Sequence, residues 1–576
     1  MNPIKSTAVL LAALTLAASA QTPANDDDHG HRIQHVLLIS IDGMHALDFI
    51  NCAHGVSSID NGAPYCPHLA DLKQHGLNYL DASTSRPSDS FPGLMAIVTG
   101  GSPRTFGAFY DVAYDRSLAP PAKATGNGLA AGDCSGQVFN GTTTEYEEGI
   151  DKDQSFLNGV GPGGGDGGVA SIDHDRLPRN PARACAAVYP WNFIRTNTVY
   201  GVIHAAHGYT AWSDKHPAYA SIAGPNSHGP DNVPENLDDY YSPEINSIPV
   251  ALPFPGCSAE DDPNFANLSA YTDSFVFTRC YDMLKVVGVL NQIDGFTHDR
   301  SRAAPVPTIF GMNFQAVSVG QKLIEGGVGS GGYLDATGSP SALLLAQIRF
   351  VDQAIGSFIT ELKKQGQLNS TLVIITAKHG QSPVDSARYT RITSTGPVTT
   401  SPSQIVDSCL PDSESNAGGQ IGPTEDDVSL LWLKPGCSTE TEVTALETQS
   451  PASHNIAGIG QIFWASALTQ LFNAPGLPPK DPRTPDIIVI PNIGVTYSKS
   501  TKKQAEHGGF AHDDVSVMLL LSNPSFSSKT FTSPVQTAQV APTLLTALGL
   551  DPDRLQAVRI EGTQVLPGLP QHENED

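Results

Sequence analysis

The chain has 576 residues, of which 40% are hydrophobic and 16% are charged. Its 58 acidic and 33 basic side chains give a formal charge of −25, which argues against a nucleic-acid polymer or an anionic membrane surface as the main partner. The apolar fraction is sufficient for a sizeable core, and 54 glycines and 44 prolines indicate long loops around it. We therefore expect a globular protein that acts on a small substrate.

The first 20 residues have the pattern of a secretory signal peptide. Lys5 precedes an apolar run over 8–18, and Ala18-Ser19-Ala20 forms a small-residue cleavage site. The run is short for a bilayer span, and no later run approaches about 20 apolar residues. We expect cleavage after Ala20, a flexible lead-in over 21–32, and a secreted or periplasmic protein without a membrane span.

Eight cysteines follow the signal sequence, and none forms a Cys-x-x-Cys pair. An even number of cysteines in an exported chain favours disulfides over a zinc ribbon or a redox motif. The sequence leaves the connectivity open. Short loops make three local pairs plausible: Cys52–Cys66, Cys257–Cys280 and Cys409–Cys437.

Three continuous apolar runs predict buried strands. The first, 36–41, ends at Asp42-Gly43, and the second, 372–377, ends at Lys378-His379-Gly380. The third covers 515–521. Such runs are typical of central strands in a parallel sheet that is covered by helices on both faces. Ligands of these sheets bind just beyond the carboxyl ends of the strands.

Helical periodicity over 341–364 leads into the second strand, and shorter helices are expected over 94–99 and 540–550. Segments rich in Pro, Gly, Ser and Asp lie between the core elements. We therefore expect one α/β domain over 33–555, with a mostly parallel central sheet between helices. Insertions at about 120–300 and 385–483 would form a cap region, and 556–576 would be a C-terminal tail.

Four polar residues next to these elements are candidates for chemistry. Ser90 precedes a helix, where a hydroxyl is placed to attack a phosphoryl group, although a plain N-cap is the commoner role of such a serine. Asp42 is either a hard metal ligand or the start of a turn. His379 and His507, each beside a glycine, could converge with them on a metal, whereas a lone histidine is usually structural.

The order of these motifs resembles the alkaline phosphatase superfamily. The motifs are a strand ending in Asp42-Gly43, Ser90-Phe91-Pro92 before a helix, a strand ending at His379-Gly380, His507-Gly508 before a strand, and a final helix from Val540. The resemblance is closest to the type I phosphodiesterase/nucleotide pyrophosphatase branch and covers about 33–110, 300–384 and 484–555. It implies that Ser90 forms a phosphoseryl intermediate beside one or two divalent ions, with zinc as the expected metal, held by Asp42, Ser90, His379 and His507.

Three expected metal ligands of that family are replaced. Its Asp-His-Gly is Lys378-His379-Gly380 here, and its Pro-Asp-x-x-Gly-His best matches 317–321, with Val317 and Gln321 at the ligand positions. Valine and a protonated lysine cannot ligate a metal. Either Lys378 and Arg86 replace part of the metal charge, or other side chains complete the site. The candidates for completing it are His512, Asp513, Asp514, Asn313, Gln321 and the Asp214-Lys215-His216 cluster.

We therefore expect an exported phosphoester hydrolase that acts through Ser90 on a small phosphodiester or nucleotide. Sulfate and phosphonate esters share this chemistry. The main alternative is a catalytically degenerate anion-binding or interaction protein on the same fold, and a weaker one is a phosphomutase or phosphotransferase. Convergence of several oxygen or nitrogen ligands around Ser90 would favour the enzyme, whereas Lys378 filling the site would favour a binding protein or a metal-poor mechanism. No oligomeric state is predicted.

Overall fold

The computed structural model describes residues 33–570, except for 136–140, 166, 226, 228–233, 417–421, 449–455 and 473–480. The expected signal peptide and lead-in lie outside the described residues.

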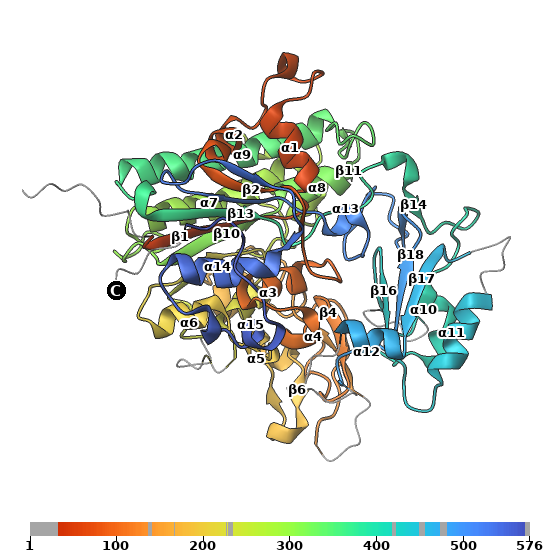
Figure 1. The fold of residues 1–576 in the computed structure, drawn as a ribbon. Coiled ribbons are helices and arrows are strands. Elements are labelled where there is room, and N and C mark those ends of the chain that lie inside the picture. The colour runs from red at the N-terminus through yellow and green to blue at the C-terminus, as the bar shows by residue number, and fades with distance from the viewer. Residues whose placement is uncertain are drawn as a thin grey trace, which may run out of the picture.

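An eight-stranded sheet forms the centre of the molecule, in the order β21-β2-β20-β13-β1-β10-β8-β9 (Figure 1). Central strand β1 (His35–Ile41) pairs in parallel with β10 (Ile309–Phe314) and with β13 (Thr371–Thr376). The outer strands are β2 (Gly76–Tyr79), β8 (Ala211–Ser213), β9 (Asp239–Tyr241), β20 (Leu519–Ser522) and β21 (Lys529–Phe531). The expected α/β class with a mostly parallel sheet is confirmed.

The third predicted strand differs from expectation in its direction and its start. β20 runs antiparallel to both β13 and β2. It begins at Leu519 because Val515 ends a short helix, α13 (His512–Val515), and Ser516 and Val517 form isolated bridges with Ser83 and His45. Its burial on both faces produces the same apolar sequence as a parallel strand, so composition alone could not reveal its direction.

Alternate residues of β1 face two separate helical layers. Val36 and Leu38 pack in one core with α3 (Ser90–Thr99), α6 (Val199–Ala205) and α14 (Val540–Ala547). Leu37, Ile39 and Ile41 pack in the other core, with α1 (Ala46–His54), α2 (Pro67–Gln74), α7 (Phe275–Ile293), α8 (Ala316–Lys322) and α9 (Ala342–Lys364). Figure 1 shows these layers on opposite faces of the sheet. Each fully buried aliphatic side chain contributes about 1.5–3 kcal/mol through burial.

Helix α9 matches the predicted periodic segment. The Ser341 hydroxyl caps it by accepting a hydrogen bond from the backbone N–H of Leu344 (3.2 Å). Among the described residues, α9 alone is long and apolar enough to cross a membrane. Its apolar residues Leu344, Ile348 and Val351 are buried in the core beside the sheet, which is the position of a core helix.

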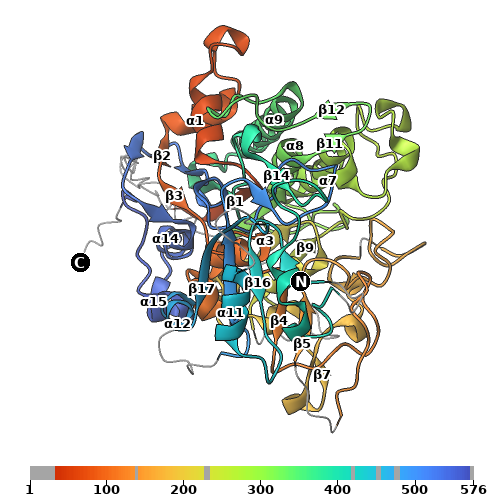
Figure 2. The ribbon, with the colours of Figure 1, turned by 90° about the vertical axis from the view of Figure 1, so that its right-hand side faces the viewer.

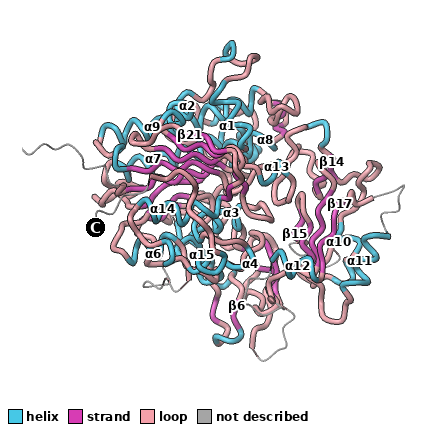
Figure 3. The backbone as a smooth tube through the Cα atoms, viewed as in Figure 1, coloured by secondary structure: helices cyan, strands magenta, loops and turns pink. Residues whose placement is uncertain are grey.

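The expected insertions contain elements of the central domain. Strands β8 and β9 and helix α7 fall inside 120–300, yet they belong to the central sheet and its cover. The later insertion contributes to a separate four-stranded sheet made of β15 (Thr424–Glu425), β16 (Ser429–Leu431), β18 (Ile487–Pro491) and β17 (Ile459–Trp464). Figure 3 shows this sheet beside the main body, with α10 (Pro402–Ile405), α11 (Thr439–Thr448) and α12 (Ser466–Phe472) around it, and Figure 2 shows it from its outer side, in front of the main body.

The remaining elements are short. The segment expected as a tail begins with α15 (Gln556–Glu561), whose Ala557 and Val558 are buried. The other pieces are β3 (Ala82–Ser83), α4 (Pro103–Phe106), β4 (Val112–Asp115), β5 (Thr142–Glu145), β6 (Arg179–Asn180), β7 (Ala186–Ala187), α5 (Pro190–Phe193), β11 (Ile324–Glu325), β12 (Gly329–Ser330), β14 (Thr390–Arg391), β19 (Val495–Thr496) and β22 (Val535–Gln536).

All eight cysteines form disulfides. The three predicted local pairs, Cys52–Cys66, Cys257–Cys280 and Cys409–Cys437, are confirmed. The fourth disulfide, Cys134–Cys185, joins residues 51 positions apart, a separation that sequence spacing does not single out. Four disulfides are typical of a protein that folds in an oxidising compartment.

Candidate active site

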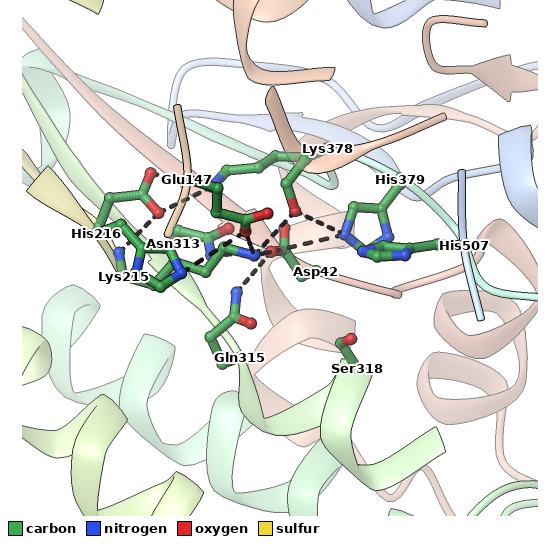
Figure 4. Close-up of polar contacts among 12 residues, drawn as sticks. Asp42, Glu147, Lys215, His216, Asn313, Gln315, Ser318, Lys378, His379 and His507 are labelled. Atoms are coloured by element: carbon green, nitrogen blue, oxygen red, sulfur yellow. Dashed lines mark hydrogen bonds and ion pairs between the residues drawn. The ribbon is translucent and has the colours of Figure 1, made fainter. Parts of the chain in front are cut away.

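Polar side chains gather where neighbouring parallel strands end. Because β13, β1, β10 and β8 are adjacent and parallel, their carboxyl ends lie at one edge of the sheet. Figure 4 shows side chains from these ends directed toward one another. They are Lys378 and His379 after β13, Asp42 after β1, Asn313 and Gln315 at the end of β10, and Lys215 and His216 after β8.

Ser90 is the first residue of α3 and is completely buried. It is not the N-cap, because the Asp89 carboxylate takes that role by accepting a hydrogen bond from the backbone N–H of Phe91 (3.0 Å). The Ser90 hydroxyl is therefore available to the strand-end cluster. Its Oγ lies 3.2 Å from Nε2 of His379 and accepts a hydrogen bond from Nζ of Lys215 (3.1 Å).

His379 is oriented as a proton acceptor for Ser90. Its Nδ1 lies 2.7 Å from the carbonyl oxygen of Gly380. A carbonyl oxygen can only accept, so Nδ1 carries the hydrogen and Nε2 presents a lone pair to Ser90. Burial lowers the pKa of His379, with Asp42 acting in the opposite direction. The imidazole is therefore neutral near pH 7, as a general base must be.

Asp42 is buried beside His379, and its Oδ2 lies 3.7 Å from Nε2 of that histidine. The same oxygen accepts hydrogen bonds from the side-chain amides of Asn313 (3.1 Å) and Gln315 (2.5 Å). Burial acts to raise the pKa of Asp42, but the nearby ammonium groups of Lys378 and Lys215 hold the pKa well below its usual value. Asp42 is therefore a carboxylate, and its Oδ1 has no hydrogen-bond partner among the described residues.

Lys215 is the central cation of the site. Besides Ser90, its ammonium contacts the Glu147 carboxylate and lies 3.9 Å from Oδ2 of Asp42. Burial acts to lower the pKa of Lys215, but Glu147 and Asp42 raise it above its usual value, so the ammonium stays charged. In the sequence, this residue stands out only as part of the Asp214-Lys215-His216 cluster, a candidate for completing a metal site. Its position after the apolar end of β8 was the available signal, although β8 is only three residues long.

Lys378 does not reach Ser90 as the expected electrostatic clamp. Its ammonium donates to both carboxylate oxygens of Asp214 (2.9 and 3.0 Å) and lies 4.0 Å from the ring centre of Tyr219. Both partners of this ion pair are fully buried. Arg86, the other expected clamp, is exposed and lines a different cavity, together with Pro103 and Phe510.

The other predicted residues divide into two groups. The ring of His507 lies against that of His379, with centroids 3.9 Å apart, so this residue joins the site. Gln321 instead donates to the carbonyl oxygen of Gly43 (2.7 Å) and to the hydroxyl of Tyr333 (2.8 Å). His512, whose side chain is 85% exposed, and Asp513 line a separate cavity.

These residues do not fit the two-metal centre that the family implies. Two of the expected ligand positions hold residues that do not ligate: Val317 is buried in the apolar core, and Gln321 is hydrogen-bonded elsewhere. Of the residues that the resemblance implies for the second of the two ions, only His507 therefore remains. At the first ion, two amide N–H groups and an ammonium already face Asp42. A dication about 4 Å from an ammonium is repelled by about 8 kcal/mol at an effective dielectric constant of about 20. The zinc prediction remains without support from this donor set.

Three further carboxylates lie beside Ser90. Asp89, Asp111 and Glu147 bring ligand atoms within 4.8 Å of one another and could hold a metal ion. Burial and the neighbouring Glu147 raise the pKa of Asp89 to about 8, and burial together with Asp89 raises the pKa of Asp111 well above its usual value. A cavity of about 290 Å³ reaches this cluster, and its lining includes Asp111, Glu147, Lys215, Gln315 and His507.

Comparisons with known proteins agree with this architecture. The model of the type I phosphodiesterase/nucleotide pyrophosphatase family matches residues 36–130 and 332–513, which include Asp42, Ser90, His379 and His507. The sulfatase family model matches 202–398, which include Lys215 and Lys378. No curated protein sequence matches the chain.

Similar solved structures include murine and human ectonucleotide pyrophosphatase/phosphodiesterase 5. Each is 14% identical and covers 90% of this chain and 95% of the other, with TM-scores of 0.49 and 0.48. A third is the inactive murine enzyme in complex with AMP, also at 14% identity with a TM-score of 0.49. The two family matches, on a mostly parallel sheet with Ser90 and His379 at its carboxyl edge, support an assignment to the alkaline phosphatase superfamily, with similarity to its type I phosphodiesterase/nucleotide pyrophosphatase branch.

Proposed function

We propose that the protein hydrolyses small phosphoesters, with Ser90 as the nucleophile and His379 as its base. The observation that carries this proposal is the contact of 3.2 Å between Ser90 Oγ and the lone pair on His379 Nε2. A nucleophile within hydrogen-bond reach of a base, with that base oriented by a third group, is the arrangement that covalent catalysis requires. Here the third group is the carbonyl of Gly380.

The reaction proceeds in two displacements at phosphorus. In the first, the Ser90 proton moves to His379 Nε2, the bond between Oγ and phosphorus forms, and the ester bond breaks. The departing alkoxide takes the proton from His379 and leaves as an alcohol. In the second, His379 removes a proton from water, the water oxygen bonds to phosphorus, and Ser90 regains its proton as the phosphoseryl bond breaks.

The cavity beside the cluster supports a small substrate. A volume of about 290 Å³ is near the lower end of the range for small-molecule sites. Its lining mixes cations, among them Lys215 and Lys322, with carboxylates such as Glu147 and Glu506. A polyanion would be repelled by the net charge of −25. A phosphodiester or a nucleotide is the substrate class that we propose, in an exported protein whose four disulfides suit such a compartment.

The test compares bis(p-nitrophenyl) phosphate with p-nitrophenyl phosphate as substrates of the purified chain. We expect Ser90→Ala to lower kcat by about 10³-fold or more, because it removes the nucleophile. Ser357→Ala is the matched control, because this serine lies exposed on α9 and only donates to the carbonyl of Gln353. Turnover that is equal in wild type and Ser90→Ala would refute the proposal.

One observation favours the alternative of a binding protein. The residues at the expected second metal site, Val317 and Gln321, are built into the fold by packing and hydrogen bonds. A protein that had lost catalysis would still bind phosphate esters through Lys215. Calorimetry with a non-hydrolysable phosphonate separates the two cases: tight binding by wild type together with no Ser90-dependent turnover on either ester supports the alternative.

A further inference from the structure

We propose that the Lys215 ammonium takes the place of a metal ion at this site, so that the hydrolysis requires no divalent cation. This inference rests on the proposed function and concerns the source of positive charge beside the nucleophile. The family resemblance implies divalent ions there, whereas the donors around Asp42, with two amide N–H groups and the Lys215 ammonium already facing that carboxylate, do not fit them.

The position of Lys215 carries the argument. Its Nζ lies between the nucleophile and the strand-end carboxylate, 3.1 Å from Ser90 Oγ and 3.9 Å from Asp42 Oδ2. Those two oxygens are the ones that the resemblance assigns to the first metal. An ammonium at this place can stabilise the serine alkoxide as it forms and can donate to a phosphoryl oxygen.

The surroundings hold this lysine in its charged form. Its ammonium contacts the buried carboxylate of Glu147, which in turn accepts a hydrogen bond from the hydroxyl of Tyr219 (2.9 Å). The side chain of Lys215 is only 9% exposed, so water does not screen these contacts. A metal ion would need the same space and would have to displace a charged, paired side chain.

A second lysine, Lys378, also stands in place of an expected metal ligand. Lys378 stands where the family pattern has a metal-binding aspartate, and it forms a closed pair with Asp214. Asp214 is fixed further by a hydrogen bond from Nε1 of Trp212 (2.8 Å). This pair engages the carboxylate of Asp214, which directly follows β8, so that this carboxylate is not free to bind a metal ion.

The first experiment measures turnover and bound metal on the same preparation. Wild type is dialysed against a chelator, its content of zinc, manganese and magnesium is determined by mass spectrometry, and the two p-nitrophenyl esters are assayed. We expect kcat to change less than about twofold while bound metal falls well below one ion per chain. Loss of Ser90-dependent turnover on chelation, with recovery on addition of zinc, would overturn this inference and leave the proposed function intact.

The second experiment removes the ammonium. We expect Lys215→Met to lower kcat by about 10²–10³-fold, the usual effect of deleting one charge-stabilising donor, with Lys215→Arg retaining part of the activity. Lys364→Met, on an exposed lysine at the end of α9, is the control. Lys215→Met/Glu147→Gln provides a variant without an unpaired buried carboxylate. Unchanged kcat in both Lys215→Met and this double variant, when both are folded, would refute the role of Lys215.

A readout independent of activity tests the exclusion of metal. With Lys215→Met, Asp42, Ser90 and His379 are free to coordinate, so we expect zinc to raise the melting temperature of this variant and not that of wild type. An equal zinc-induced rise in wild type would contradict the inference. If neither ester shows Ser90-dependent turnover, the proposed function fails first, and the inference fails with it.

Discussion

Ser90 Oγ and His379 Nε2 lie 3.2 Å apart, although 289 positions separate the two residues in the chain. The beginning of α3 supplies one and the end of β13 supplies the other. The close approach of these two elements depends on Gly93, where an added Cβ would lie 2.1 Å from the carbonyl oxygen of Lys378. The pairing of nucleophile and base is therefore fixed by backbone packing.

Gly93→Ala is expected to damage catalysis by moving the two elements apart. The clash is with backbone rather than with a flexible side chain, so α3 must shift relative to β13. A displacement of about 1 Å can cost about 10²-fold in rate. We expect kcat to fall by about that factor with KM changed much less, as measured with bis(p-nitrophenyl) phosphate.

Gly326→Ala is the matched control, because a Cβ there meets no atom within 4 Å among the described residues. Equal activity of Gly93→Ala and Gly326→Ala, with both proteins folded, would show that the contact between α3 and β13 does not position the nucleophile.

The pH dependence should report the protonation of His379. The groups that face it are Asp42, Lys215, His507 and Glu506. The base must be neutral, and burial lowers the pKa of His379 below its ordinary value of 6.5. We therefore expect kcat/KM to fall as the pH drops through a value below 6.5, and to stay level between that value and neutrality.

The check is a pH profile of kcat/KM for wild type and His379→Gln. The variant should lose most of the activity and also this acidic limb. An acidic limb centred above pH 6.5, or one that persists unchanged in His379→Gln, would assign the titration to another group.

The buried pair Lys378–Asp214 should matter for stability. Removing one partner of a buried ion pair costs about 3–5 kcal/mol, because the other charge remains unpaired. We expect Lys378→Met to lower the free energy of unfolding by about 3 kcal/mol, since the Asp214 carboxylate still accepts hydrogen bonds from Trp212 and from the backbone N–H of Lys215. Urea denaturation measures this change.

The double variant Lys378→Met/Asp214→Asn should recover part of the loss, because it removes both charges together. Lys123→Met is the surface control, since its pair with Asp173 is exposed to solvent at the lysine. A loss in Lys378→Met no larger than in Lys123→Met would mean that the buried pair does not stabilise the fold.

Much of the fold follows from local sequence. Strands β1 and β13 and helix α9 were predicted nearly to the residue, because burial on both faces of a strand and on one face of a helix leaves distinct apolar patterns. The direction of β20 was wrong, since an antiparallel strand in the same buried position has the same pattern. Strands β8 and β9 fall in the region that the Pro-, Gly-, Ser- and Asp-rich segments assigned to an insertion, and each is only three residues long, which leaves little apolar pattern.

The site was less accessible to sequence reasoning. Asp42, Ser90, His379 and His507 follow motifs, and the structure brings them together. Lys215 follows no such motif, and only the parallel neighbour relation between β8 and β10 places it beside Ser90. Lys378 was expected to face the substrate, but it pairs with Asp214, which directly follows β8, a strand that the sequence did not assign to the sheet.

The most direct test of the account is to trap the covalent intermediate. Wild type is mixed with bis(p-nitrophenyl) phosphate after chelation, quenched in acid within one turnover and digested for peptide mass spectrometry. The account predicts a phosphoryl adduct, retaining one p-nitrophenyl group, on the peptide that carries Ser90, and none in Ser90→Ala. Turnover without any adduct on Ser90, or an adduct on another residue, would contradict it.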